Sequence, residues 1–342
     1  MHRETDPPRT APVSAGLARP WLLADIGGTN ARFGWLAEGS STPGHVLTLP
    51  TADHAGPVMA ALQYLRGLRQ RLGSDYQPPR AAAWAVATAV AGDAVHFTNS
   101  SWSFSRAAAQ ADLMLDELLV LNDFKALALS LPRLQTHQLR CFGGPQQGLA
   151  GAALAVIGPG TGLGVAGLLP TAHGWVAIPG EGGHATLAAT DDFDAAVLAA
   201  VRREYAHVSA ERLLSGIGLP VLHAAVALVL GQPRPPLTAG EVVAGALQAG
   251  DPVCERTVDS FCALLGGFAG NVALTLGARG GVYIGGGIVP RLGERFFQSA
   301  FRQRFEGKGR FQGYLLAVPT ALITDTLAAL TGAAFALELH GR

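Results

Sequence analysis

The sequence predicts an α/β protein with two domains, and three observations support this. Apolar runs of strand length alternate with segments whose apolar residues recur at helical spacing. The order apolar run, Gly/Thr turn, apolar run occurs twice, at 22–36 and 154–169, which indicates two related halves that face each other. The chain also has 342 residues, which exceeds the size that one hydrophobic core usually supports.

The composition excludes several classes of protein. Apolar residues make up 49% of the chain, so a large core is available, and the net charge is zero, without the basic footprint of a nucleic-acid binder. The three cysteines lack CxxC spacing, which fits a reducing cytoplasm and argues against a disulfide framework or a structural zinc site. No uninterrupted apolar run reaches membrane-spanning length. We therefore expect a cytoplasmic protein without a nucleic-acid or membrane partner.

Strands and helices alternate in the first half. The segment 55–72 has apolar residues at helical spacing and ends at Gly73, which predicts a helix. Small apolar residues fill 81–91, as in a strand buried on both faces, and the polar and aromatic segment 96–105 predicts a loop lining a cleft. The expected elements are strands at 22–26, 31–36, 46–49, 81–91 and 118–121, and helices at 55–72, 106–115 and 124–131.

The second half begins with the second Gly/Thr hairpin. The segment 302–311 is the most charged of the chain, and its Arg302, Arg304, Glu306, Lys308 and Arg310 predict a solvated face. A last amphipathic helix, 327–339, is expected to return to the first domain. The other expected elements are helices at 192–204, 210–230, 241–249 and 252–276, and strands at 281–284 and 315–323.

These elements define the expected domains. Residues 1–20 form a leader, whose Pro, Arg and acidic residues predict disorder rather than a signal peptide. Residues 21–132 together with 325–342 form a small α/β domain, and residues 133–324 form a large one.

The first hairpin has a tight turn that suits phosphate. Its glycines, Gly27 and Gly28, let a ligand approach the backbone, and their N–H groups with the Thr29 hydroxyl form a concave set of donors, beside Asn30. Asp25 ends the preceding strand, and a carboxylate beside phosphate is repulsive unless a cation such as Mg²⁺ lies between them. An ordinary hairpin with a solvated Asp is the alternative.

Three glycine clusters follow buried strands, at 27–28, 158–164 and 285–287. Together they indicate a nucleotide held between two domains. The candidate nucleotide-binding residues of the later clusters are Gly160, Thr161, Gly162, Gly285, Gly286 and Gly287. No P-loop motif is present, and the GxGxxG match at 162–167 is followed by Leu-Leu-Pro, which leaves no room for the helix of a dinucleotide fold.

Two polar groups remain open to alternatives. Asn122-Asp123 follows a buried strand and precedes a helix, so it predicts either an N-cap or a general base. Glu181 and His184 lie in a glycine-rich turn that fits metal ligands, a solvated loop or, our preferred interpretation, the recognition of a polyol by an acceptor and a donor. Glu211 is interpreted as a residue of the first turn of a helix, with Ser209 as the N-cap of that helix.

Taken together, these motifs resemble the bacterial ATP-dependent glucokinase family, which is related to hexokinases within the actin-like superfamily. The resemblance runs from about residue 21 to about residue 335. It rests on the segments 25–32, 98–102, 122–124, 160–164, 179–184, 208–216, 281–290 and 308–311. The cysteine-rich zinc motif of the ROK relatives is missing, which places the chain outside that branch.

The resemblance implies a two-domain actin-like ATPase fold, related to ribonuclease H, with an interdomain cleft, and a homodimer. It implies phosphoryl transfer from MgATP to the 6-hydroxyl of glucose, with Asp123 as the base that takes the hydroxyl proton and Asp25 as the residue that reaches Mg²⁺. It further implies that the sugar is bound by Asn99, Asn122, Asp123, Glu181, His184 and Glu211. For Glu211 this replaces the helix interpretation.

The chain departs from the family pattern at three places. Ser100 stands where the family usually has His, and Thr88-Ala89 where it has Cys-Pro, so the sugar preference is open. Thr326-Leu327-Ala328 stands where Asn-Pro-Gly is usual, which affects the hinge or the adenosine side. The rival hypotheses are a kinase for mannose, fructose or an amino sugar, and a non-catalytic sugar- or nucleotide-binding regulator on the same fold.

Overall fold

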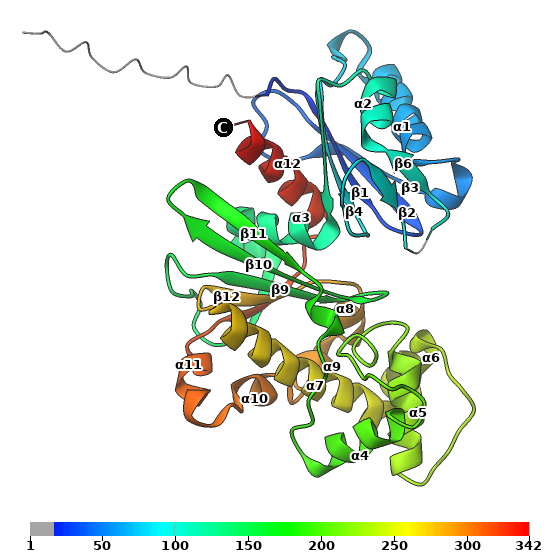
Figure 1. The fold of residues 1–342 in the computed structure, drawn as a ribbon, viewed down its shortest axis with the longest axis vertical. Coiled ribbons are helices and arrows are strands. Elements are labelled where there is room, and N and C mark those ends of the chain that lie inside the picture. Colours follow the sequence, from blue (N-terminus) through cyan, green and yellow to red (C-terminus); the bar gives the residue numbers. More distant parts are fainter. Residues whose placement is uncertain (1–16, 99, 342) are drawn as a thin grey trace, which may run out of the picture.

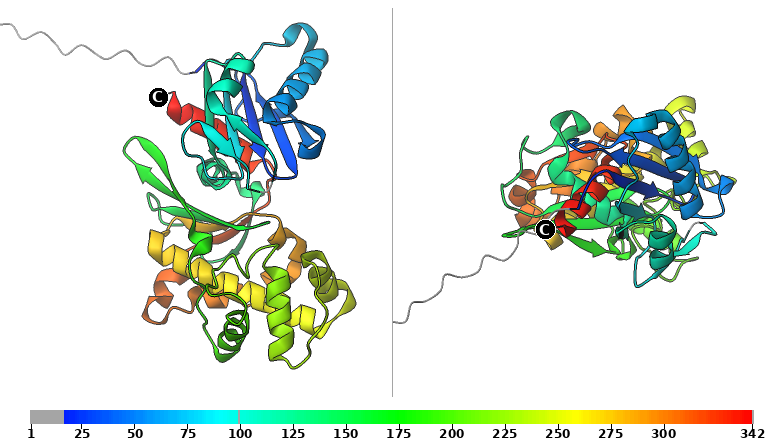
Figure 2. Two further views of the ribbon diagram at one scale, coloured as in Figure 1. Left: turned by 45° about the vertical axis from the view of Figure 1, so that its right-hand side comes forward. Right: turned by 90° about the horizontal axis from the view of Figure 1, so that it is seen from above.

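The computed structural model describes residues 17–98 and 100–341, which form two mixed sheets with helices packed around them. The sheets lie in two lobes, as Figure 1 shows, and Figure 2 gives two further views of the same arrangement. The leader expected at 1–20 falls almost wholly outside the described residues. The predicted α/β class is confirmed.

The first sheet has five strands in the order β3-β2-β1-β4-β7. β1 pairs antiparallel with β2, and β1, β4 and β7 run parallel to one another. The strands are β1 (Trp21–Ile26), β2 (Asn30–Leu36), β3 (Gly44–Pro50), β4 (Ala81–Val86) and β7 (Glu117–Asn122). The carboxyl ends of β1, β4 and β7 therefore meet at one edge.

The second sheet has six strands in the order β11-β10-β9-β12-β13-β8. β9 and β10 form the second hairpin, and β12 and β13 run parallel to β9. The strands are β8 (Leu139–Gly143), β9 (Leu154–Pro159), β10 (Leu163–Thr171), β11 (Gly174–Gly180), β12 (Gly281–Ile284) and β13 (Thr320–Ile323).

The two sheets repeat one topology. In each, an antiparallel meander of three strands is extended by two strands that run parallel to its first strand, so β3-β2-β1-β4-β7 corresponds to β11-β10-β9-β12-β13. Only β8 lacks a counterpart in the first sheet. The internal repeat predicted from the two hairpins is therefore present in the fold.

Two helices connect the sheets. α3 (Asp123–Ser130) packs against β9, β10 and β11 and also against α12 (Ala328–His340), which lies on β1 and β4. Figure 1 shows α12, in red at the end of the chain, beside the first sheet. One hydrophobic cluster joins both helices to strands of both sheets, which include Leu23 and Val156. The last helix thus returns to the first sheet, as expected.

The remaining helices cover the outer faces. α1 packs on the first sheet, and α5 and α7 belong to the core of the second. The helices are α1 (Pro57–Leu72), α2 (Arg106–Asp112), α4 (Asp192–Val201), α5 (Leu219–Val229), α6 (Ala239–Ala244), α7 (Pro252–Leu276), α8 (Ile288–Leu292), α9 (Glu294–Phe297), α10 (Phe301–Glu306) and α11 (Gln312–Leu316). α7 is long and apolar enough to cross a membrane, but 83% of its most apolar stretch is buried inside the protein, as in a core helix.

Several sequence expectations were wrong in their limits. The helix expected at 210–230 begins only at Leu219, because 211–217 instead bonds to the turns of the second hairpin and of Glu181. The strand expected at 315–323 is split into α11 and β13, since Pro319 ends the helical turn. The helix expected at 106–115 stops at Asp112, and Met114 has φ of 54°, which no helix accommodates.

The prediction of a solvated face for the charged segment 302–311 was also wrong. Arg302 is mostly buried and donates to the carbonyls of Val318 and Leu315 at 2.8 and 3.0 Å. Lys308 donates to the carbonyl of Gly267 at 2.9 Å. These cations hold the chain around α10 and α11 together, because carbonyls without strand or helix partners need donors. The segment 96–105, expected as a loop, contains part of the small hairpin β5 (Ala94–His96) and β6 (Ser103–Ser105).

Candidate active site

The first hairpin turn is anchored from behind by Thr51. Its N–H donates to the carbonyl of Thr29 at 2.9 Å, and its hydroxyl donates to the carbonyl of Gly28 at 2.8 Å. The N–H of Gly27 donates to the carbonyl of Asn30 at 2.9 Å, which closes the turn. Thr29 and Asn30 remain exposed. The turn is thus held by its carbonyls, with the side chain of Thr29 open to a ligand.

Asp25 lies next to this turn, near the end of β1. Burial raises the pKa of its carboxyl, and the guanidinium of Arg32, 3.7 Å away, opposes that rise. Arg32 also donates to the carbonyl of Thr326, in the segment that leads from β13 to α12. Since this acceptor is a main-chain carbonyl, the unusual residue at position 326 leaves the contact possible.

Of the two roles predicted for Asn122-Asp123, the structure shows the N-cap, and it belongs to Asn122. Asn122 is the N-cap of α3, since its Oδ1 accepts from the N–H groups of Phe124 and Lys125. Its Nδ2 donates to Oδ1 of Asp123 at 2.9 Å and to the carbonyl of Thr88 at 3.3 Å. The cap interpretation is therefore right for Asn122, and it leaves the carboxylate of Asp123 oriented by its neighbour.

The pKa of Asp123 is raised to about 6, mainly by burial, and the charge of Asp25 adds to the rise. The N–H of Phe124 and the amide of Asn122 act in the opposite direction. The two carboxylates interact electrostatically because both lie at the carboxyl edge of the first sheet, where β1, β4 and β7 are adjacent and parallel. Polar groups at such an edge are a common ligand position in α/β folds.

The second hairpin turn is fixed by the loop before α5. The N–H of Gly160 donates to the carbonyl of Gly162, and the N–H of Gly216 donates to the carbonyl of Gly160, both at 2.8 Å. The third glycine cluster packs at its base, where the N–H of Gly285 donates to the carbonyl of Ile157 at 2.8 Å. A Cβ at Gly286, where φ is 77°, would lie 2.4 Å from the carbonyl oxygen of Pro159. Two of the three clusters are therefore one structure, and β10 runs through the GxGxxG match as a strand.

Glu211 and His184 meet although 26 residues separate them in sequence, since Nε2 of His184 lies 3.8 Å from Oε1 of Glu211. Oε2 of Glu211 accepts from the N–H of Leu163 at 2.8 Å, so the same carboxylate reaches the second hairpin. His184 is largely exposed and Glu211 mostly buried. Glu181 precedes a short turn, in which its carbonyl accepts from the N–H of His184 at 3.0 Å, and its side chain is exposed.

Trp102, the last residue of the predicted sugar segment, is held firmly in the first lobe. Its ring is buried, and its Nε1 donates to the carbonyl of His54 at 3.0 Å. Ser100, where the family usually has His, accepts from the N–H of Trp102 at 3.2 Å and shapes the turn. Asn99, predicted to bind sugar, lies outside the described residues.

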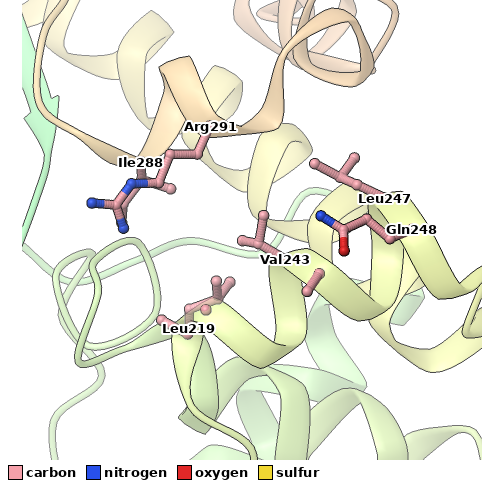
Figure 3. Close-up of a pocket in the computed structure, with 9 residues that line it drawn as sticks. Leu219, Val243, Leu247, Gln248, Ile288 and Arg291 are labelled. Carbon is pink, nitrogen blue, oxygen red and sulfur yellow. The ribbon is translucent and has the colours of Figure 1, made fainter.

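A pocket of about 220 Å³ opens between α5, α6 and α8. Figure 3 shows Leu219, Val243 and Arg291 approaching it from these three helices, with Gln248 from the π-helical turn Gly245–Ala249 at its far side. Sequence patterns missed Gln248 and Arg291, because residues so far apart in the chain give no joint signal. The glycine cluster 285–287 leads directly into α8, and residues of α8 line this pocket.

One interpretation of the turn that holds Glu181 and His184 is a metal site. Within residues 17–98 and 100–341, no group of three or more His, Cys, Asp or Glu side chains is arranged to hold a metal ion. Glu181 and His184 therefore have no third partner, and the metal interpretation of that turn finds no support. The cysteines Cys141, Cys254 and Cys262 are free.

Comparison with known proteins identifies the family. A sequence model of the glucokinase family matches residues 22–340. A glucokinase of Aromatoleum aromaticum is 48% identical over 327 residues, which are 96% of this chain and 97% of that one. A glucokinase of Chromobacterium violaceum is 46% identical, with 96% and 92% of the two chains covered.

A solved structure agrees with these sequences. The crystal structure of a glucokinase from an Antarctic psychrotroph superimposes with a TM-score of 0.85 at 37% identity, over 93% of this chain and 98% of that one. The chain therefore belongs to the glucokinase family, the enzymes that phosphorylate glucose with ATP, and has the two-domain actin-like ATPase fold of these sugar kinases.

Proposed function

We propose that Asp123 takes the proton of the 6-hydroxyl of glucose while the γ-phosphoryl group of ATP is transferred to that oxygen. The oxygen attacks phosphorus in line, the bond to the β–γ bridging oxygen breaks, and the proton moves to the carboxylate. The observation that carries this assignment is the position of Asp123 directly after β7, at the carboxyl edge of the first sheet, where the amide of Asn122 and the N–H of Phe124 donate to its Oδ1. Burial and the charge of Asp25 raise the pKa of this carboxyl to about 6. A base with a pKa near the working pH is both ionised and basic enough to accept a proton.

The two hairpin turns bind the phosphates in this proposal. The first contributes Gly27, Gly28, Thr29 and Asn30, and the second contributes Gly160, Thr161 and Gly162. The N–H groups of Gly27 and Gly160 close their own turns, and the carbonyls of Gly28, Thr29 and Gly160 are bonded from behind. In this proposal the phosphates are therefore bound by the other N–H groups of the two turns and by the hydroxyl of Thr29. Gly285, Gly286 and Gly287 support the second turn and lead toward the nucleoside.

Asp25 fits Mg²⁺. One carboxylate beside a phosphate-binding turn is the kind of site this ion uses, since Mg²⁺ keeps several waters and takes its other ligands from phosphates. The absence of a larger acidic cluster among the described residues is consistent with that mode. When bound, the ion neutralises phosphate charge. The burial of Asp25, which raises its pKa, favours a cation beside it once it is ionised.

The sugar hydroxyls are bound by Asn122, Glu181, His184 and Glu211, together with Asn99. The contacts of Glu211 support this role. Its Oε2 is held by the N–H of Leu163, and its Oε1 faces His184, so that an acceptor and an imidazole lie side by side. Asn122 has both amide hydrogens engaged, with Asp123 and Thr88, so its contact with sugar requires the longer bond to Thr88 to open. Until then it orients Asp123.

The nucleoside end of ATP lies in the pocket between α5, α6 and α8. Its volume of about 220 Å³ is below the roughly 300–1,000 Å³ typical of sites for whole ligands, which suits one end of a nucleotide. Its lining is mainly apolar, with Gln248 and Arg291 as polar groups. A flat aromatic base with polar edges has this character.

We further propose the domain limits 21–132 with 325–342 and 133–324, which separate the two sheets. We also propose a homodimer in the cytoplasm. Light scattering after gel filtration tests the dimer, and a mass of one chain would refute it.

A coupled assay of ADP release over a panel of sugars tests the function. Glucose is expected to give the highest kcat/KM, ahead of mannose, fructose and amino sugars, and Asp123→Ala is expected to lower kcat at least a hundredfold. A higher value for another hexose would make that sugar the substrate. Release of ADP with no sugar dependence would reject the assignment.

A further inference from the structure

The ring of Phe124 lies on two facing glycines at the base of the second hairpin. Gly158 and Gly164 are direct partners across β9 and β10, so their side-chain positions share one face of the sheet. A Cβ at Gly158 would lie 2.4 Å from Cζ of Phe124, and one at Gly164 would lie 2.0 Å from Cδ2 and Cε2. We call these two glycines the glycine socket. Only glycine at both positions leaves room for the ring.

Phe124 also contacts the proposed base directly. Its N–H donates to Oδ1 of Asp123 at 2.9 Å and to Oδ1 of Asn122 at 2.9 Å. The same residue therefore binds the carboxylate with its main chain and the second hairpin with its ring.

The socket and the carboxylate belong to different sheets. Asp123 follows β7 of the first sheet, while β9 and β10 belong to the second. Gly158 is two residues before Gly160, and Gly164 is two residues after Gly162, so the ring lies directly below the proposed phosphate turn. Phe124 thus connects the group that accepts the proton to the turn that binds the phosphoryl donor.

A second contact fixes the rotation of α3. Leu127, one turn after Phe124, packs on Gly285, where an added Cβ would lie 2.8 Å from Cδ2 of Leu127. Two side chains of α3 therefore fit over glycines that lie in or directly after strands of the second sheet. Because packed interiors have few voids, such contacts define position closely.

We propose that Phe124 is a positioning residue that sets the distance between the Asp123 carboxylate and the second phosphate turn by filling the glycine socket. This inference rests on the proposed role of Asp123. Transfer between bound groups depends strongly on their placement, and a displacement of about 1 Å costs on the order of a hundredfold in rate. The polar contacts of the Glu211 and His184 side chains, both proposed to bind sugar, are to the N–H of Leu163 and to each other, so glucose binding is expected to depend less on the ring.

The first experiment compares Phe124→Leu with Leu129→Val. Leu129 is a buried residue of the same helix that faces the core with α12, and serves as the packing control. Phe124→Leu is expected to lower kcat at least tenfold, to change the KM for glucose less than threefold, and to move the acidic limb of the pH profile below 6, since the carboxylate gains water. Leu129→Val is expected to lower Tm and to leave kcat and the pH profile unchanged. Equal behaviour of the two variants would overturn the inference.

The second experiment tests the socket by size compensation. Gly164→Ala adds a methyl group where the ring lies, so it is expected to lower kcat, and combination with Phe124→Leu makes room for that methyl group. The kcat of the double variant is expected to be at least threefold higher than the value obtained when the fold-losses of the two single variants are multiplied. Strictly multiplicative losses in kcat would overturn the inference. If Phe124→Leu does not fold, Phe124→Met replaces it in both experiments. Failure of the proposed base is seen separately, as normal turnover in Asp123→Ala.

Discussion

Asp25, near the carboxyl end of β1, and Asp123, which follows β7, lie at one edge of the first sheet with β4 between the two strands, and the charge of Asp25 raises the pKa of Asp123. Two neighbouring carboxylates resist ionising together, which fits the proposed roles of Asp25 beside a cation and of Asp123 as a proton acceptor. The arrangement follows from three parallel strands, and from no local sequence motif.

The pH dependence of turnover reports this relationship. Asp123 must be ionised to accept a proton, and its pKa is raised to about 6, so kcat/KM for glucose is expected to rise with pH and level off above about 7. A limb near the ordinary value of 3.8 would contradict the assignment. The profile is measured at saturating MgATP, with excess coupling enzyme at every pH.

Stability is expected to show the opposite trend. Because the pKa of Asp123 is higher in the folded state than its ordinary value, the stability contributed by protonation is complete below about pH 4 and is lost as pH rises through 6. Asp123→Asn should therefore raise Tm by a few degrees at pH 7.5 and by clearly less at pH 4.5. Thermal unfolding at both pH values checks this, and equal shifts would mean that charge is not the cause.

Two glycines of the second turn are expected to differ. A Cβ at Gly162 would lie 2.4 Å from Oε2 of Glu211, whereas one at Gly160 meets nothing within 4 Å. Gly162→Ala must displace the Glu211 carboxylate, so the KM for glucose is expected to rise roughly tenfold, about the value of one lost bond to a charged group. Gly160→Ala is the matched control, with an unchanged KM for glucose. Steady-state kinetics in both variants decide it.

Glu211 connects the proposed sugar site, through His184, to the proposed phosphate turn, through the N–H of Leu163. Glu211→Ala leaves the N–H of Leu163 without its acceptor, so both the KM for glucose and that for ATP are expected to rise, by roughly tenfold or more for glucose. Glu204→Gln, which changes an exposed carboxylate earlier in the chain, is the control and should behave as the parent. An effect on Tm alone, with both KM values unchanged, would show that Glu211 is only structural.

The pocket residue Gln248 is expected to affect ATP and not glucose. Gln248→Leu should raise the KM for ATP several-fold, since a polar edge of the base loses its partner, while the KM for glucose stays constant. Gln70→Leu, on the exposed face of α1, controls for a general loss of polarity. If ATP binding is unaffected, the base lies elsewhere.

Much of the chain could be predicted because its signals are local. The helix at 252–276 and the strand at 281–284 were predicted to the residue, since long periodic runs and short apolar runs ended by glycine depend on neighbours alone. The limits of 210–230 failed for the opposite reason. That segment is apolar and helical in pattern, but hydrogen bonds to Gly160 and Gly183 hold its first part in turns.

The sequence by itself determined the two hairpins, the glycine clusters at strand ends, the α/β class and the family, because each is written in neighbouring residues. Only the tertiary structure brought Asp25 beside Asp123, Glu211 beside His184, and the Phe124 ring onto Gly158 and Gly164. Such pairs depend on strand order and on how two sheets pack against one helix. These contacts are long-range, and their energy is realised only when the whole core has formed.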